Sequence, residues 1–147
     1  LHSTRLFDWH TRALWKSSML WVLYLAYSCL TLGFALKASS VWLGISPSLS
    51  VHAFTVGGIG VLTLGMMSRV TLGHTGRNVQ QPPNGLPIAF MLLLIAAIAR
   101  ILLPLLLPSQ YTIWIGISQA LWIAAFSIFV IVFAPILIRP RIDGQPG

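Results

Sequence analysis

Charged residues are scarce in this chain. Only 7% of its 147 residues are charged and 56% are hydrophobic, whereas ordinary soluble domains carry roughly 25% charged residues. Just two residues are acidic, so the chain has almost no carboxylates for proton transfer inside a membrane. The composition excludes a soluble globular domain and does not favour an enzyme.

Cysteine and alternating hydrophobicity are also nearly absent. The single cysteine, Cys29, excludes an internal disulfide and a thiolate metal cluster. Strands of a membrane barrel alternate polar and apolar residues over about 10 positions, but residues 91–99 and 121–138 contain almost no polar side chain. Helices are therefore the elements that carry this chain across a bilayer.

The chain does contain four apolar runs, each close to the roughly 20 residues that a helix needs to cross hydrocarbon. The runs cover residues 17–36, 51–72, 86–107 and 112–138. The sequence predicts an all-α fold, a polytopic transmembrane helical bundle of four spans that forms a single membrane domain over residues 1–147. The residues between the first two spans are predicted to form a polar loop.

The formal net charge is +7, and the placement of the basic residues explains it without a nucleic-acid partner. With alternating spans, one side of the membrane receives Arg5, Arg12, Lys16, Arg69, Arg77, Arg139 and Arg141. The opposite side receives only Lys37. The positive-inside rule then predicts that both termini are cytoplasmic, and the partner indicated by the composition is the lipid bilayer.

The second span and its flanks carry a histidine near each end, in the sequence VHAFTVGGIGVLTLGMMSRVTLGHTGR. Neutral imidazole is a common protein ligand for haem iron and copper. His52 and His74 are 22 residues apart, roughly 33 Å along a helix, so they cannot ligate the same metal. They are predicted to belong to two different sites, although His52 also fits an ordinary polar residue at the membrane boundary.

Small residues and methionines inside the same span leave alternatives open. Ala53, Gly57 and Gly60 are spaced to form one stripe on an α-helix, which suits close packing of another helix and also a flat cofactor. Met66 and Met67 are thioether donors suited to Cu(I), but they are also ordinary packing residues. Packing is the preferred interpretation of both features.

The residues Gly73-His74-Thr75-Gly76-Arg77 have the composition of a helix end. Glycine adopts the left-handed backbone conformations that end helices, which would free His74 and Arg77 to face a ligand. An arginine beside a histidine suits a haem propionate or a lipid phosphate through charge-assisted hydrogen bonds. The residues alone do not separate these two ligands.

This stretch resembles the signature of a known family. The runs His52-Ala-Phe-Thr-Val-Gly-Gly-Ile-Gly and Met67-Ser-Arg-Val-Thr-Leu-Gly-His-Thr-Gly-Arg77 are similar to the NnrS family, and Trp9-His10 resembles its C-terminal region. The resemblance implies a multi-pass protein of the bacterial inner membrane that contains haem and copper and is linked to nitric oxide, nitrosative stress and denitrification. Because such proteins have about a dozen spans, the chain is expected to be a C-terminal fragment that packs against the preceding spans.

The two cofactors implied by the resemblance, haem and copper, lead to a hypothesis of two separate positions, with His52 and His74 as metal ligands. The first is a far-side position at His52, whose second ligand comes from another helix. The second is a cytoplasmic position formed by His74, Arg77 and His10, which share the predicted cytoplasmic side. The rival function is part of a membrane transporter or channel, with Arg100 and the glycine-rich span lining a path.

Arg100 lies inside the third span, where a charge costs about 2.5 to 3.5 kcal/mol on insertion scales. The two acids, Asp8 and Asp143, both lie on the predicted cytoplasmic side and are poor partners for it. Arg100 is expected either to extend toward the far interface past Pro104 or to pair with an acceptor. Another helix or a haem propionate would supply that acceptor.

Overall fold

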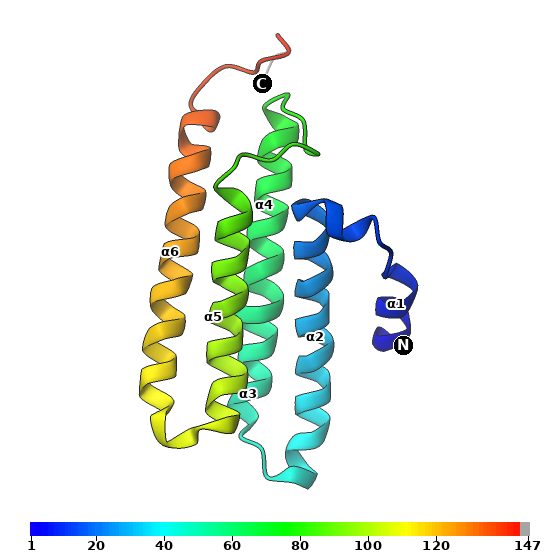
Figure 1. Cartoon of the computed structure of the whole chain (residues 1–147), viewed down its shortest axis with the longest axis vertical. Helices are drawn as coiled ribbons and strands as arrows, with labels where there is room; N and C mark the ends of the chain where they lie inside the picture. Colours follow the sequence, from blue (N-terminus) through cyan, green and yellow to red (C-terminus); the bar gives the residue numbers. More distant parts are fainter. Residues whose placement is uncertain (145–147) are drawn as a thin grey trace.

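Four long antiparallel spans dominate the fold (Figure 1). The computed structural model describes residues 1–144, and this part of the chain contains helices and connecting segments but no strand. The elements, in chain order, are α1 (His2–Trp9), η1 (Leu14–Lys16), α2 (Ser18–Leu43), α3 (Pro47–His52), η2 (Ala53–Gly60), α4 (Val61–His74), α5 (Leu86–Leu106), η3 (Pro108–Gln110) and α6 (Tyr111–Leu137). The second span is therefore assembled from three consecutive helical segments, α3, η2 and α4.

Four helical stretches are long and apolar enough to cross a membrane, Ser18–Leu43, Pro47–His74, Leu86–Leu106 and Pro108–Leu137. This confirms the predicted all-α bundle of four spans, while the cytoplasmic placement of the two termini stays a prediction. Large apolar side chains cover much of the outer surface, and on α6 the exposed ones include Ile113, Ile123 and Ile131. An apolar outer surface is what a lipid-facing helix needs.

The two ends of the bundle differ in charge. The basic end contains the start of α2, the end of α4, the start of α5 and the end of α6 (Figure 1). Its basic side chains include Lys16, Arg77 and Arg139. The far end contains the end of α2, the start of α3, the end of α5 and η3.

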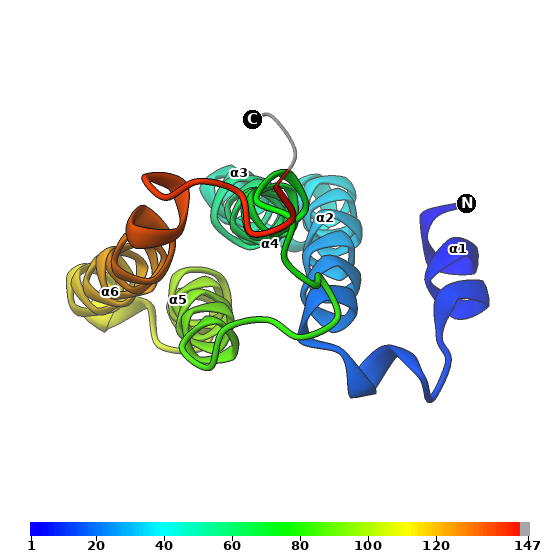
Figure 2. The same ribbon diagram turned by 90° about the horizontal axis from the view of Figure 1, so that it is seen from above.

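The core surrounds the second span. Seen from above, α2 lies on one side of this span, and α5 and α6 lie beside each other on the other side (Figure 2). The main core cluster draws fully buried side chains from all four spans, among them Val22, Leu64, Phe90 and Phe133. A smaller cluster near the far end joins α2, α3, η2 and α5.

The polar loop predicted over residues 37–50 is wrong for most of its length. The helix of the first span continues to Leu43, and only residues 44–46 separate it from α3. Gly44 ends α2 with a φ of 61°, a left-handed conformation that favours glycine. Pro47 restarts the chain as a helix because its fixed φ suits the first helical turn. Two residues with special backbone preferences thus set the turn, and the polar side chains around them do not.

The centre of the second span is a π-helix, which the sequence analysis did not predict. In η2 the backbone bonds run from residue i to i+5, so the angular spacing of side chains departs from that of an α-helix. The stripe expected from α-helical spacing was Ala53, Gly57 and Gly60. The small residues that are buried are instead Ala53, Gly57 and Gly58, and Gly60 is half-buried.

The buried glycines of η2 press directly against α2. A Cβ atom built on Gly57 would lie 2.8 Å from the Cβ of Cys29, and one built on Gly58 would overlap the side chain of Leu30. On α2, a Cβ on Gly33 would lie 2.8 Å from the ring of Phe54. The small residues therefore serve close helix packing, which was the preferred interpretation of the stripe.

The segment α1 folds back along the outer side of α2 (Figures 1 and 2). The Nδ1 atom of His2 and the hydroxyl of Tyr27 are 2.7 Å apart, a hydrogen-bond distance. The His2 ring also stacks on the ring of Phe34, with centroids 5.0 Å apart. The start of the chain consequently lies beside the middle of α2 and away from both ends of the bundle.

Candidate functional site

His52 is the last residue of α3 and directly precedes the π-helix, near the far end of the bundle. Its side chain is half-buried. His52 lies five residues after Pro47, the first residue of its span, which is about 7.5 Å along a helix. Arg100 lies six residues before the end of α5, about 9 Å along its helix. Both distances are measured from the far end of the bundle. An imidazole and a guanidinium thus lie at a similar depth on neighbouring spans.

Arg100 has an incomplete set of partners. Its Nε atom is buried and has no hydrogen-bond partner within residues 1–144. Its side chain lines a pocket of about 380 Å³ together with residues from η2 and α6, including Ser118, Gln119 and Trp122. The structure brings neither Asp8 nor Asp143 to this pocket, in line with the expectation that the two acids are poor partners for Arg100.

His74 lies at the opposite end of the second span, as its last helical residue, and is exposed. The turn that follows is closed by backbone hydrogen bonds, from Thr75 N to Thr71 O at 3.1 Å and from Arg77 N to Leu72 O at 2.9 Å. Gly76 adopts a φ of 73°, as the sequence predicted for a glycine at a helix end. Arg77 is half-buried, and its Nη1 donates to the carbonyl oxygen of Thr75, two residues earlier, at 3.4 Å.

The C-terminal segment passes over this turn at the basic end. A Cβ atom on Gly76 would lie 2.7 Å from the carboxylate carbon of Asp143, and Ile142 N donates to Thr75 O at 3.4 Å. Arg141 donates from Nε and Nη2 to the two carboxylate oxygens of Asp143, at 2.9 and 2.6 Å. This hydrogen-bonded ion pair raises the pKa of Arg141. One of the chain's two acids therefore lies against Gly76, in the turn that links His74 to Arg77, which sequence reasoning missed.

His10 is not brought to His74. Its ring packs against Trp15 and Tyr24, with ring centroids 6.3 and 6.1 Å away, and its Nε2 atom accepts a hydrogen bond from Trp15 Nε1 at 3.4 Å. Helix α2 lies between α1 and α4 (Figure 2). The proposed cytoplasmic position is therefore assembled here from His74 and Arg77, with His10 on the other side of α2.

The remaining candidate donors are also dispersed. Met66 and Met67 are 43% and 40% exposed on α4, as expected for side chains that face lipid or a further helix. Within residues 1–144, no group of three or more His, Cys, Asp or Glu residues is placed to hold a metal ion. A complete metal site would need ligands from outside these residues.

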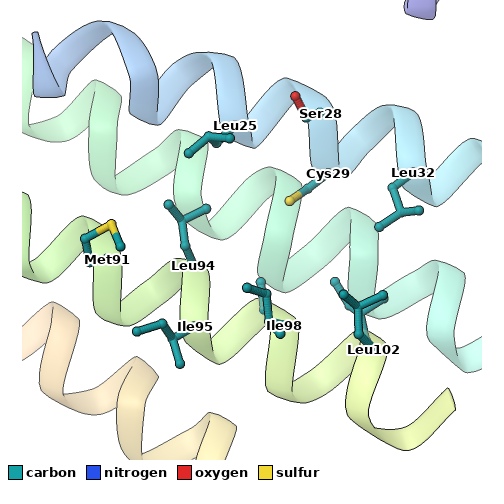
Figure 3. Close-up of a pocket in the computed structure, with 11 residues that line it drawn as sticks. Leu25, Ser28, Cys29, Leu32, Met91, Leu94, Ile95, Ile98 and Leu102 are labelled. Carbon is teal, nitrogen blue, oxygen red and sulfur yellow. The ribbon is translucent and has the colours of Figure 1, made fainter. Parts of the chain in front are cut away.

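An apolar pocket of about 370 Å³ lies between α2 and α5. It is separate from the pocket at Arg100, which lies where α5 faces α6. Figure 3 shows Cys29 and Leu32 of α2 on one wall and Leu94, Ile98 and Leu102 of α5 on the opposite wall. Cys29 remains a free thiol. No sequence pattern predicts this pocket, because its width depends on how far apart two helices are held by a third.

Comparison with known proteins gives one family. A model of the family described as NnrS protein matches residues 1–141 of the chain. No curated protein and no solved structure matches it. The match covers both histidines of the second span, Arg77 and Arg100, and it confirms the resemblance predicted from residues 52–77. The chain belongs to the NnrS family.

Proposed function

We propose that this chain forms a haem- and copper-binding part of a bacterial inner-membrane protein that handles nitric oxide during nitrosative stress and denitrification. Two facts support the proposal: membership of the NnrS family and the position of His52. A half-buried imidazole at membrane depth, on a helix that contacts the one carrying an arginine with an unsatisfied Nε, is the observation that carries it. Polar groups at that depth are costly unless they are paired, which favours a functional role.

His52 fits the role of one ligand to haem. It would hold the iron through an imidazole nitrogen, since histidine is a common protein ligand of haem iron. Any further protein ligand would come from another span of the same protein, because His74 lies at the opposite end of its span. Bound haem would supply an iron coordination position suited to a small gas such as nitric oxide, and the chain's own role would be to hold and orient it.

The second position is proposed at His74 and Arg77. The exposed imidazole would be a metal ligand, and the arginine would hold an anionic group such as a propionate by charge-assisted hydrogen bonds. The residues present fit one nitrogen ligand and do not form a copper site by themselves. Copper at this position would need ligands in addition to His74.

The rival proposal is a part of a transporter or channel. It relied on the glycine-rich second span and Arg100 lining a path. Gly57 and Gly58 are buried against α2, so the glycine face of this span is occupied by helix packing. Only Arg100 still supports the rival, and for this reason the metal-binding proposal is preferred.

The test measures haem by its Soret absorbance and copper by elemental mass spectrometry in the purified membrane protein. We expect His52→Ala to lower haem content and shift the Soret band, and His74→Ala to remove bound metal without reproducing that shift. His2→Ala is the matched control, because His2 contacts Tyr27 and Phe34 away from both positions.

The outcome that contradicts the two-position proposal is unchanged haem content, Soret position and copper content in both the His52 and the His74 variant. Protein that binds neither haem nor copper before any substitution would favour the transport proposal.

A further inference from the structure

The pocket at Arg100 has a distinct chemical character. It is about 380 Å³ in volume and lies between η2, α5 and α6, and it is lined by Val56, Arg100, Ser118, Gln119, Trp122 and Ile123. These six residues define what is called here the Arg100 pocket. Its walls combine apolar surface with a few polar groups, which is the usual composition of small-molecule sites.

The polar groups of the Arg100 pocket are mainly donors. The guanidinium carries five N–H groups and accepts nothing, and Trp122 brings an indole N–H. Ser118 gives its hydroxyl proton to the carbonyl of Ala96 at 2.8 Å, which ties α6 to α5. Gln119 adds two amide N–H donors and one acceptor oxygen. The pocket is therefore built to receive a ligand that accepts hydrogen bonds.

The charge of Arg100 has no counter-charge from the described residues. Its Nε is buried without a hydrogen-bond partner among residues 1–144. Asp143 is paired with Arg141 at the basic end, and Asp8 lies on α1 beyond α2. Because the interior of a membrane screens charge poorly, the guanidinium needs an anion from elsewhere.

The geometry of a guanidinium selects among anions. Its planar fork matches the two oxygens of a carboxylate better than a single-point acceptor. The walls formed by Val56, Ile123 and the Trp122 ring suit an apolar body attached to that carboxylate. Arg100 lies inside a membrane-spanning helix, so a ligand that already partitions into the bilayer reaches it most easily.

We propose that the Arg100 pocket binds the carboxylate of a membrane-partitioning amphiphile. Two sources carry this group: a fatty acid of the bilayer and a propionate of haem. The proposal goes beyond metal ligation at His52, because the pocket recognises the carboxylate whether or not a metal is present.

The test compares each acid with its own ester, in the full chain reconstituted in phosphatidylcholine nanodiscs. Spin-labelled stearate and its methyl ester are titrated by electron paramagnetic resonance, and haem and haem dimethyl ester by absorbance. Two charge-assisted hydrogen bonds predict about a tenfold preference for the acid over the ester. Arg100→Gln should abolish this preference, and Arg69→Gln, which changes an exposed arginine on α4, should leave it intact.

A second variant tests the proposal even if Arg100→Gln does not fold. Trp122→Phe keeps an aromatic wall and removes one N–H donor, so it should lower the acid preference about two- to threefold. Folding of each variant is checked by its circular dichroism and its elution as a single species.

Each result bears on the proposal directly. Loss of the acid preference in Arg100→Gln for stearate alone identifies a fatty acid, loss for haem alone identifies a propionate, and loss for both shows a pocket that takes either. An acid preference that is absent in the unmodified chain, or unchanged in Arg100→Gln for both ligands, overturns the proposal. Protein that binds no haem would contradict the proposed function, while the stearate titration would still decide this one.

Discussion

The two ends of the second span place their histidines in opposite surroundings. At the far end, His52 is half-buried, is the last residue of α3 before the π-helix, and lies at a similar depth to Arg100 of α5. At the basic end, His74 is exposed on the last helical residue before a turn. Two histidines in one stretch of sequence therefore have different environments, because one lies among packed helices and the other lies at a turn.

Glycine also has two different uses along this span. At the centre, Gly58 is needed because α2 approaches so closely that a side chain would overlap Leu30. At the basic end, Gly76 is needed because its φ of 73° disfavours other residues and because Asp143 lies against it. The centre of the span therefore depends on glycine for space, and the basic end depends on it mainly for backbone conformation.

The largest effect in this comparison is expected for Gly58→Ala at the centre of the span. The new methyl group would overlap the Leu30 side chain, so Leu30 or η2 itself would have to shift. Overpacking of this kind costs about 1–3 kcal/mol. Unfolding in a detergent–denaturant mixture, followed by circular dichroism, measures the change in free energy.

The matched control for this substitution is Gly73→Ala, in the last turn of α4, where a Cβ atom would have nothing within 4 Å. Alanine is the better helix former by up to about 1 kcal/mol, so this variant should be no less stable than the original. Equal destabilisation by both substitutions would contradict the claim that close packing at Gly58 holds the centre of the span against α2.

A smaller and more local effect is expected for Gly76→Ala at the basic end. A left-handed conformation costs a residue with a Cβ atom roughly 1–2 kcal/mol, and the new methyl group would also push against Asp143. The C-terminal segment should detach from the turn while the four spans stay packed. Hydrogen exchange of the Ile142 amide, which donates to Thr75 O, should become faster.

Gly116→Ala serves as the control for this second prediction, because it lies in α6, has open space around it and does not have a positive φ. It should leave exchange at Ile142 unchanged. If Gly76→Ala instead lowered the stability of the whole bundle as much as Gly58→Ala does, the distinction between the centre of the span and its basic end would be wrong.

The sequence predicted the number and type of spans because runs of apolar residues are a local property that survives any arrangement of helices. It also predicted the turn after His74, since Gly76 carries the required backbone freedom in its own identity. It missed the π-helix, because the choice between i+4 and i+5 bonding depends on how η2 meets α2. Spacing rules for an α-helix then assigned Gly60 to the buried stripe in place of Gly58.

The candidate site was predictable only in part for the same reason. Residue type and helix length separated His52 from His74 correctly. Contacts between distant segments were out of reach, so sequence reasoning placed His10 with His74 and missed both Asp143 beside Gly76 and Gln119 beside Arg100. Each of these contacts depends on which helices are neighbours, and no short sequence pattern encodes that.

The smallest effect is expected for Arg141→Gln, which removes the ion pair with Asp143 at the basic end. Folding raises the pKa of Arg141 through the hydrogen bonds to that carboxylate. The ion pair therefore stabilises the folded chain at every pH below the ordinary arginine pKa, and this stabilisation is lost only above it. Arginine titrates above pH 12, and therefore the contribution should stay constant between pH 6 and 10. The measurement is the difference in thermal midpoint between the variant and the original chain at pH 6, 8 and 10.

Arg139→Gln is the matched control for this charge removal, because Arg139 is exposed two residues earlier in the same segment. The thermal midpoint should fall only slightly more for Arg141→Gln than for Arg139→Gln. In 1 M salt the two variants should have equal midpoints, since the ion pair is near the surface and salt screens such pairs. A difference that grew between pH 6 and 10, or that persisted in 1 M salt, would show that the basic end is held by a buried charge interaction. In that case the contrast between close packing at Gly58 and a C-terminal segment held at the surface would have to be abandoned.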